Sequence, residues 1–320
     1  MNEPSYDLDA FLQTTKNDLE NKITNTISDK QIVTVMEGGR RLRPFISILS
    51  FKACTQGNES SEQYQKALEG AVGIELAYTV SIIHEDIIEK SKKRRGRAAF
   101  HVKESIDNAI LFSHKILTVG FDIALNHGDD MARLFVDSWD VTLSGELGEI
   151  DFNKKDMKSS MDMNTESVIF NEYLKIIDQK TATLFATACK AGAIEANMTD
   201  DILKVFADYG REIGLAYQLA DDLVDLIKGN KINNAIFPLI NKLEDKIKAV
   251  SLRKKIDKET PTKYSSGIEQ LFICEIKKHV SKAEELSKSE SIPPSNFKNF
   301  LNEAPSYIAN KMLKVIKITV

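Results

Sequence analysis

Proline is missing from the long central part of this chain. The 320 residues include seven prolines, and none of them lies between Pro44 and Pro238. A proline inside a helix removes a hydrogen bond and costs about 3 kcal/mol, so long helical arrays exclude it. The same stretch contains no Asn-Gly or Asp-Gly pair, which would signal a tight β-hairpin. It therefore predicts an all-α architecture.

Apolar residues recur at helical spacing through the proline-free stretch. Thr199, followed by Asp200 and Asp201, fits a helix N-cap with an acidic first turn, and Gly229 fits the end of that helix. A helix between them has roughly 30 residues and is about 45 Å long. Further helices are expected over residues 66–90, 105–126, 130–148 and 166–192.

No linker divides the first 240 residues. A polar segment covers residues 253–268, and Pro293 and Pro294 interrupt the segment 287–297. We therefore expect one large all-α domain over residues 1–320, with residues 250–320 forming a helical annex.

The composition narrows the function classes. Lys and Arg number 43 and Asp and Glu number 47, and this net charge of −4 argues against a nucleic-acid partner. The N-terminus lacks a signal-peptide pattern, and the apolar run 71–83 contains Glu75 and is too short to span a membrane. Three widely spaced cysteines indicate neither a disulfide framework nor a zinc site. We expect a cytoplasmic protein without a transmembrane segment.

Two clusters of acids lie inside apolar helices. Asp221, Asp222 and Asp225 occur in LAYQLADDLVDLI, and a second cluster at residues 85–89 follows AVGIELAYTVSIIH. Each cluster has an i, i+4 pair, which shares one helix face. On spacing alone, a solvated helix face would explain either cluster. The apolar flanks favour buried carboxylates, which need compensation such as a divalent cation with oxygen ligands.

Two arginine-rich segments suggest phosphate binding. Residues 38–44 read GGRRLRP, and residues 92–97 read KKRRGR directly after the acidic cluster at 85–89. An arginine fork matches phosphate oxygens with two hydrogen bonds. Carboxylates that hold Mg²⁺ beside arginines that hold phosphate fit a metal-bound diphosphate ligand. The alternative is a basic surface patch.

These segments together resemble the trans-isoprenyl diphosphate synthases, the polyprenyl synthetase family. GGRRLRP is similar to GGKRLRP, HEDIIEKSKKRRG to HDDxxDxSxxRRG, and YQLADDLVD to FQxxDDxxD. Gly145-Glu146 matches the GQ motif and Lys180-Thr181 the KT motif. The motifs occur in the family's order over residues 38–238. The resemblance implies an all-α bundle of the isoprenoid synthase type with a central cavity.

The resemblance also implies a reaction. Members condense isopentenyl diphosphate with an allylic diphosphate, and Mg²⁺ bridges the acidic motifs and the allylic diphosphate. It places Glu85, Glu89, Asp221 and Asp225 on the metal ions, with Asp86 and Asp222 in support. It assigns Arg94, Lys180 and Lys228 to the allylic diphosphate. It assigns Arg40, Arg43 and Arg95 to isopentenyl diphosphate, with Tyr78 where a His or Gln is usual. It places Thr181 and Gln218 beside the developing allylic cation.

Product length depends in this family on residues just upstream of the first acidic motif. Here these residues are Ala77, Val80 and Ser81, and none is a blocking Phe or Tyr. The resemblance therefore implies a product longer than farnesyl diphosphate, with geranylgeranyl diphosphate expected. It also implies a homodimer.

The sequence departs from the family pattern at several places, which include Tyr78 and His114, the latter where an Asp is usual. Glutamates stand at positions 85 and 89 where Asp is usual, and the segment KGNKINNAIFP after Asp225 is short. These departures keep two alternatives open. One is a weak or inactive homologue that serves as a partner subunit or a prenyl-diphosphate binder. The other is a terpene cyclase, which would not need the arginines of GGRRLRP for a second diphosphate.

Overall fold

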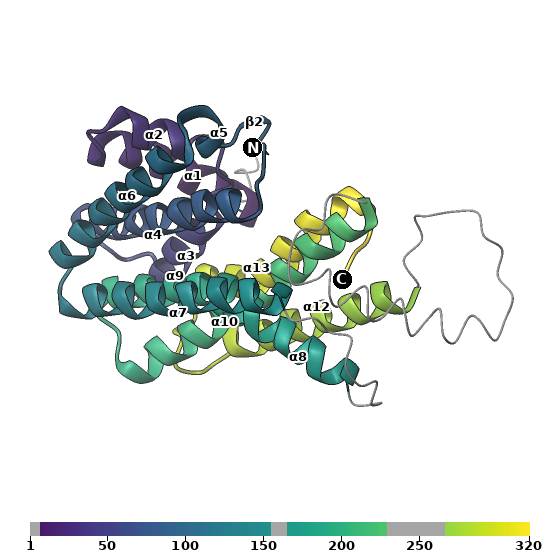
Figure 1. Ribbon diagram of the computed structural model, residues 1–320. Helices are drawn as coiled ribbons and strands as arrows, with labels where there is room; N and C mark the ends of the chain where they lie inside the picture. Colours follow the sequence, from purple (N-terminus) through teal and green to yellow (C-terminus); the bar gives the residue numbers. More distant parts are fainter. Residues whose placement is uncertain (1–6, 155–164, 229–265) are drawn as a thin grey trace, which may run out of the picture. The chain divides into compact units, whose positions relative to one another are not determined.

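The computed structural model describes residues 7–154, 165–228 and 266–320 (Figure 1). Apart from two strands of two residues each, the regular elements in these ranges are helices, which confirms the all-α prediction. The chain divides into two compact units. The first contains residues 1–139, 184–210 and 284–304, and the second contains residues 140–183, 211–283 and 305–320. The single-domain assignment stays a prediction.

The first unit contains most of the N-terminal helices. They are α1 (Leu8–Thr26), α2 (Lys30–Met36), α3 (Leu42–Thr55), α4 (Ser61–Ile88), α5 (Phe100–Glu104) and α6 (Ile106–Asn126). Two strands, β1 (Lys93–Arg94) and β2 (Arg97–Ala98), form an antiparallel hairpin between α4 and α5. The unit also includes α9 (Thr183–Glu195) from Leu184 onward.

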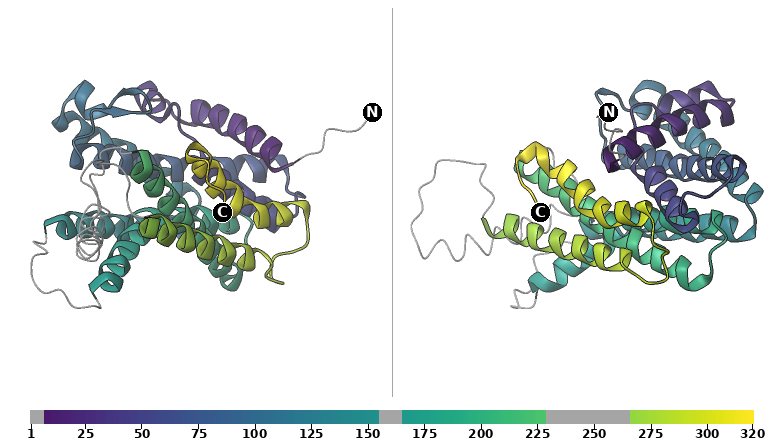
Figure 2. Two further views of the ribbon diagram at one scale, coloured as in Figure 1. Left: turned by 90° about the vertical axis from the view of Figure 1, so that its right-hand side faces the viewer. Right: turned by 180° about the vertical axis from the view of Figure 1, so that it is seen from behind.

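The second unit contains the middle and C-terminal helices. It includes α8 (Thr165–Ile177), the π-helical turn η1 (Asp178–Ala182) and the 3-10 turn η2 (Lys314–Ile316). Besides α9, whose first residue belongs to the second unit, four described helices have residues in both units: α7 (Asp129–Lys154), α10 (Asp200–Lys228), α12 (Ser266–Ser287) and α13 (Asn296–Leu313). Aromatic rings join α8 to α12, which lie side by side in Figure 2: Phe272 is 5.9 Å from Tyr173 and 6.3 Å from Phe170, centroid to centroid.

Helix α4 is the centre of the first unit, where it contacts α1, α2, α3, α5 and α6 (Figure 1). It begins with a capping box, in which Ser60 and Gln63 bond each other's backbone N–H groups. Every residue from 70 to 77 is buried, and all of them except Glu75 are apolar or glycine. The middle of α4 is thus a rigid core element, and the helix carries the first acidic motif at its C-terminal end.

Most of the predicted helices are present near their expected bounds. The predictions 66–90, 105–126 and 130–148 match α4, α6 and α7, and the backbone oxygen of Thr199 accepts the first helical bond of α10. The helix predicted over 166–192 is instead interrupted by η1. Residues 250–320 are helical where described, and Pro293 and Pro294 separate α12 from α13. Gly229 and most of the short segment after Asp225 lie outside the described residues.

Helix α13 contains Pro305 in its interior, which the sequence pattern did not predict. Proline has no N–H group, so the carbonyl of Leu301, four residues earlier, loses its helical donor. The buried Tyr209 hydroxyl donates to that carbonyl oxygen over 2.6 Å. A side chain of α10 therefore replaces the hydrogen bond that proline removes from α13.

We predict that Tyr209→Phe lowers the free energy of unfolding by about 1–3 kcal/mol, because it leaves the buried Leu301 carbonyl without a donor. Urea unfolding followed by circular dichroism measures this change. Tyr307→Phe, on the same helix as Leu301 but outside this contact, is the control. Equal stability of Tyr209→Phe and the unchanged protein would show that the carbonyl has another donor.

One helix in the described part of the chain, α6, is long and apolar enough to cross a membrane by length and composition alone. The sequence pattern had not singled it out. About 39% of its apolar window is buried inside the protein, and Ile116 and Leu117 belong to the core around α4. A helix that contributes to the core of a globular unit passes the same test, so this observation is weak evidence for a membrane span.

Candidate active site

The basic segment after α4 forms the β1–β2 hairpin. Arg95 and Gly96 occupy its two-residue turn, with φ angles of 52° and 78°. This turn type needs positive φ at both positions, which is strained for Arg95. The Arg95 guanidinium donates to the backbone oxygens of Met36 and Glu37 at 3.2 and 3.1 Å. These bonds hold the turn against the segment that precedes GGRRLRP.

Arg94 binds an acid of the first motif. Its Nε and Nη2 donate to Oδ1 of Asp86 at 2.9 and 2.7 Å. Burial raises the pKa of Asp86, although the Arg94 hydrogen bonds act in the opposite direction. Arg94 is thus bonded to the buried Asp86. Its Nη2 also lies 3.8 Å from the Glu85 carboxylate.

Glu85 and Glu89 lie at the C-terminal end of α4, and both are half-buried. Glu89 caps the helix through its backbone N–H, which donates to the Glu85 backbone oxygen over 2.8 Å. The two predicted metal-binding glutamates are therefore one turn apart on one helix face. That placement agrees with the expected i, i+4 pair.

The arginines of GGRRLRP have different environments. Arg41 is 2% exposed, and its guanidinium bonds Glu75 at 2.7 Å and Glu20 at 2.9 and 3.0 Å. Gly39 leaves room for this guanidinium, since a Cβ there would lie 2.5 Å from Nη1 of Arg41. Burial tends to lower the pKa of Arg41, but its bonds to Glu20 and the charge of Glu75 raise it. Arg41 is thus a structural group.

Arg43 is buried between aromatic rings. Its guanidinium carbon lies 3.7 Å from the ring centroid of Tyr78 and 4.5 Å from that of Phe185. Its Nε is buried and has no hydrogen-bond partner. Arg40, by contrast, is exposed. A buried, stacked guanidinium with an unpaired N–H is ready to bind an anion, and Tyr78 serves here as a support for Arg43.

The KT motif lies in the π-helical turn η1. The Thr183 N–H donates to the Asp178 oxygen five residues earlier, and this insertion in the helix is a feature that is frequent at functional sites. Gly145 permits the close approach of this turn, because a Cβ there would lie 2.7 Å from the backbone N of Lys180. Lys180 is 8% exposed, and its Nζ bonds Glu149 at 2.8 Å and lies 3.7 Å from Glu146.

A chain of hydrogen bonds joins the KT motif to the second acidic motif. The Thr181 hydroxyl donates to Oε1 of Gln218 at 2.9 Å, and Nε2 of Gln218 donates to Oδ1 of Asp222 at 3.0 Å. The Tyr173 hydroxyl donates to Oδ2 of Asp222 at 2.6 Å. The second unit thus brings together Thr181, Gln218 and Asp222. The sequence did not predict Tyr173, because no motif or spacing links this residue of α8 to Asp222 on α10.

The side-chain carboxyl group of Asp222 has a raised pKa. Burial and the adjacent Asp221 raise its pKa to about 8, while the bonds from Tyr173 and Gln218 act in the opposite direction. Asp221 and Asp225 are half-buried, and Lys228 is exposed at the end of α10.

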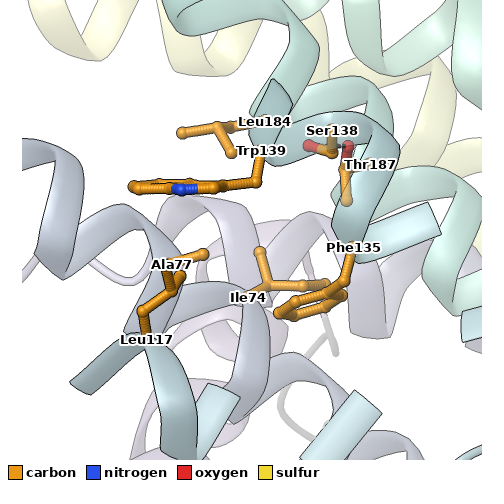
Figure 3. Close-up of a pocket in the computed structure, with 8 residues that line it drawn as sticks. All are labelled: Ile74, Ala77, Leu117, Phe135, Ser138, Trp139, Leu184 and Thr187. Carbon is orange, nitrogen blue, oxygen red and sulfur yellow. Dashed lines mark hydrogen bonds between the residues drawn. The ribbon is translucent and has the colours of Figure 1, made fainter. Parts of the chain in front are cut away.

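The residues predicted to set product length have different surroundings on α4. Val80 is 1% exposed and belongs to the core cluster with Leu76 and Ile83. Ser81 is buried, and its hydroxyl donates to the Tyr78 backbone oxygen over 2.9 Å. Ala77 alone of the three lines an apolar cavity of about 10 Å³ (Figure 3).

Trp139 is the largest side chain around that cavity. In Figure 3 its ring lies between Leu184 and Ala77, and its centroid is 6.2 Å from that of His84 on α4. The other lining residues are Ile74, Leu117, Phe135, Ser138 and Thr187. The sequence alone does not single out Trp139, because a tryptophan within a helical pattern is ordinarily a core residue.

The carboxylates of both units fit a hard divalent cation by their chemistry. They supply the oxygen ligands that such a cation prefers. Among the described residues, no three His, Cys, Asp or Glu side chains lie close enough together to hold a metal ion. Two of these acids hold other partners instead, since Arg94 bonds Asp86 and Tyr173 bonds Asp222.

The sequence comparisons agree with the motifs. The family model described as polyprenyl synthetase matches residues 25–251. The chain belongs to the polyprenyl synthetase family. A geranylgeranyl diphosphate synthase of Methanosarcina mazei is 33% identical over 190 residues, which are 59% of this chain and 55% of that protein. A short chain isoprenyl diphosphate synthase of Methanothermobacter thermautotrophicus is 31% identical over 221 residues, 65% of this chain and 63% of that protein.

The chain thus spans less than two thirds of the length of these two polyprenyl synthetase relatives. A crystal structure of geranylgeranyl pyrophosphate synthase is similar over 97% of this chain and 99% of that one, with a TM-score of 0.73 and 21% identity. This likeness extends the shared fold beyond the aligned sequence.

Proposed function

We propose that this protein is a prenyltransferase that condenses isopentenyl diphosphate with an allylic diphosphate to give a longer all-trans prenyl diphosphate. The observation that carries the proposal is the hydrogen-bonded chain Thr181–Gln218–Asp222, with buried Lys180 in the same π-helical turn. It joins residues of one unit to which we assign diphosphate, metal and carbocation contacts. A merely structural helix would have no use for such a costly arrangement.

Metal binding is assigned to the carboxylates of the two acidic motifs. Mg²⁺ would be held by Glu85, Glu89, Asp221 and Asp225. Asp86, which is bonded to Arg94, and Asp222, which is bonded to Tyr173, would support these four carboxylates. Bound Mg²⁺ would supply positive charge that stabilises the departing diphosphate. A polyprenyl synthase of Caulobacter crescentus with a similar fold, TM-score 0.66 and 21% identity, was crystallised with calcium and isoprenyl diphosphate, which supports a divalent cation.

The remaining residues divide between two diphosphates. Lys180, Arg94 and Lys228 would hold the allylic diphosphate as its C–O bond breaks, and their charges disperse the negative charge that develops on it. Arg40, Arg43 and Arg95 would hold the diphosphate of isopentenyl diphosphate. The stack of Arg43 on Tyr78 fixes the direction of the guanidinium.

The allylic carbon becomes a cation when the bond to the diphosphate breaks. The oxygens of Thr181 and Gln218 present partial negative charge to it. The double bond of isopentenyl diphosphate then forms the new C–C bond, and a neighbouring carbon loses a proton to the released diphosphate. No protein nucleophile is consumed, which agrees with a mechanism that uses charge and positioning.

Release of pyrophosphate distinguishes the three functions. A condensing enzyme releases it only with Mg²⁺ and both substrates. A cyclase releases it from an allylic diphosphate alone, and a binding subunit releases none. We expect release to require all three components; release without isopentenyl diphosphate would replace the proposal with the cyclase.

We propose geranylgeranyl diphosphate as the product. The named relatives include geranylgeranyl, geranylfarnesyl and octaprenyl diphosphate synthases, so the family alone leaves the length open. No Phe or Tyr stands at residues 77, 80 or 81. The cavity beyond Ala77 is only about 10 Å³, which is room for about one water. Trp139 therefore closes the space next to Ala77 and limits the chain.

We predict that Trp139→Leu lengthens the product by at least one isoprene unit, because the smaller side chain opens the space between Leu184 and Ala77. Chromatography of the dephosphorylated products measures the change. Phe121→Leu, which removes an aromatic ring from the neighbourhood without touching the cavity, is the matched control. An unchanged product in Trp139→Leu would mean that the chain grows in another direction.

We further propose a cytoplasmic homodimer. Helix α6 presents exposed apolar residues, among them Ile106, Leu111 and Leu125 at 52%, 70% and 65% exposure. Such a face is typical of a subunit contact. Sedimentation at the mass of one 35.9 kDa chain would contradict the dimer.

A further inference from the structure

The π-helical turn η1 is bonded to α10 at two points. Asp178, the first residue of the turn, accepts hydrogen bonds from Arg211. Thr181, the fourth residue, donates to Gln218. Arg211 and Gln218 are seven residues apart, so they lie two turns apart on one face of α10. The contact at Thr181 belongs to the candidate active site, whereas the sequence motifs include neither Asp178 nor Arg211.

The two oxygens of the Asp178 carboxylate accept parallel bonds from one guanidinium. Nε of Arg211 donates to Oδ1 over 2.5 Å, and Nη2 donates to Oδ2. A paired contact of this kind fixes the direction of both groups. The backbone oxygen of Asp178 accepts the Thr183 N–H that closes the π turn, and the Thr183 hydroxyl donates to it over 3.1 Å. Arg211 thus holds the residue at which the wider turn begins.

The Arg211–Asp178 pair lies partly at the surface. Its side chains are 50% and 21% exposed, and an ion pair in such a place contributes little to the stability of a whole fold. A π turn is rare, and an unusual backbone arrangement persists only where its surroundings maintain it. The effect expected from this pair is therefore local, on the form of the turn.

The form of the turn determines where two assigned site residues lie. Lys180 and Thr181 are inside it, where Lys180 bonds Glu149 and Thr181 bonds Gln218. If the turn relaxed to ordinary α-helical bonding, the segments before and after it would rotate against each other by about 100°. Both side chains would then lose the direction that they have now.

We propose that Arg211 and Asp178 are positioning residues, whose ion pair keeps η1 in the π-helical form. This form would direct Lys180 to the departing diphosphate and Thr181 to the allylic cation. These two roles rest on the proposed function, whereas the hold on the turn rests on the contacts alone. Since Lys180 and Thr181 act as the bond to the diphosphate breaks, loss of the pair should lower kcat and leave the KM for isopentenyl diphosphate unchanged.

Arg211→Gln and Asp178→Asn each remove the ion pair. We expect each variant to lower kcat at least about tenfold, because a small misplacement of reacting groups is costly, and to change the KM for isopentenyl diphosphate less than about twofold. The double variant should lose no more than either single variant, since all three lack the same interaction. Circular dichroism and urea unfolding should show the same fold and nearly the same unfolding midpoint.

Lys278→Gln is the matched control. Lys278 lies in the same unit and bonds Glu275 on α12, and these two side chains are 52% and 18% exposed, close to the values for Arg211 and Asp178. This variant removes a comparable ion pair without touching η1, so it should keep normal kcat. Arg211→Lys keeps the charge but not the two parallel bonds, and its kcat should lie between those of Arg211→Gln and the unchanged protein.

Hydrogen exchange without substrates or metal measures the turn independently of turnover. We expect the backbone N–H groups of residues 178–183 to exchange at least about fivefold faster in Arg211→Gln, because the turn opens locally more often. Lys278→Gln should leave their exchange unchanged.

Normal kcat in both single variants would overturn the positioning role. Losses that multiply in the double variant, or an equal loss in Lys278→Gln, would also overturn it. Unchanged exchange of residues 178–183 in Arg211→Gln would show that the pair does not hold the turn. If the unchanged protein never condenses its substrates, the proposed function fails and with it the two catalytic roles, and the exchange rates then decide the hold on the turn.

Discussion

Asp221→Ala is expected to lower kcat by about 10³-fold or more, because it removes a carboxylate that would hold the metal at the departing diphosphate. Asp221 is half-buried at the centre of the second acidic motif, and its charge contributes to the raised pKa of the adjacent Asp222. Its loss should leave the chain Thr181–Gln218–Asp222 in place.

Circular dichroism and urea unfolding check that the Asp221→Ala protein is folded. Asp201→Ala, an exposed acid in the first turn of the same helix, is the control and should keep normal turnover. Near-normal turnover of Asp221→Ala would reject the metal assignment, while equal losses in both variants would point to damage to α10.

Arg41→Ala is expected to lower the free energy of unfolding by about 3–5 kcal/mol. Glu75 is 1% exposed, and Nη1 of Arg41 at 2.7 Å neutralises its charge. Removal of the guanidinium leaves that carboxylate buried without a counter-charge, and it also releases Glu20 on α1. The variant should therefore loosen α1 and α3 from α4.

Urea unfolding at neutral pH measures this loss. Arg41→Met/Glu75→Gln, which removes both buried charges, should recover a large part of the stability, because the cost lies in the unpaired charge rather than in the lost pair. Arg40→Ala, an exposed change at the adjacent position, should cost little. A loss below about 1 kcal/mol for Arg41→Ala would show that Glu75 finds another cation.

The helices could be predicted from the sequence because their signals are local. The absence of proline and the apolar periodicity placed α4, α6, α7 and α10 near their observed bounds. The hairpin could not be predicted, since its Arg95-Gly96 turn puts a non-glycine residue at positive φ and relies on bonds to Met36 and Glu37. The π-helical turn was not predicted because the chain is helical on both sides of it, so residues 166–192 resemble one helix.

The site shows the same division between local and distant causes. Motif order identified Lys180, Thr181, Gln218 and Asp222, which the second unit brings together. Spacing could not separate Arg41 from its neighbours in GGRRLRP, because its partners Glu20 and Glu75 come from two other helices. Tyr173 has no sequence signal for the same reason.

The product-length prediction shows a further limit. Ala77, Val80 and Ser81 are close in sequence, yet Val80 belongs to the core cluster and only Ala77 of the three lines the cavity. Which helix face meets a cavity depends on neighbouring helices, and these bring Trp139 and Leu117 to Ala77. A sequence motif names positions, whereas the packing decides which of them can limit a growing chain.

The most direct test is a condensation assay with labelled isopentenyl diphosphate. The purified protein is incubated with Mg²⁺ and, in separate reactions, with dimethylallyl, geranyl and farnesyl diphosphate. The dephosphorylated products are then separated by chromatography. We predict a series of labelled products that ends at the geranylgeranyl chain length. No labelled product from any of the three primers, with protein shown to be folded, would contradict the proposed prenyltransferase and favour a binding or partner subunit.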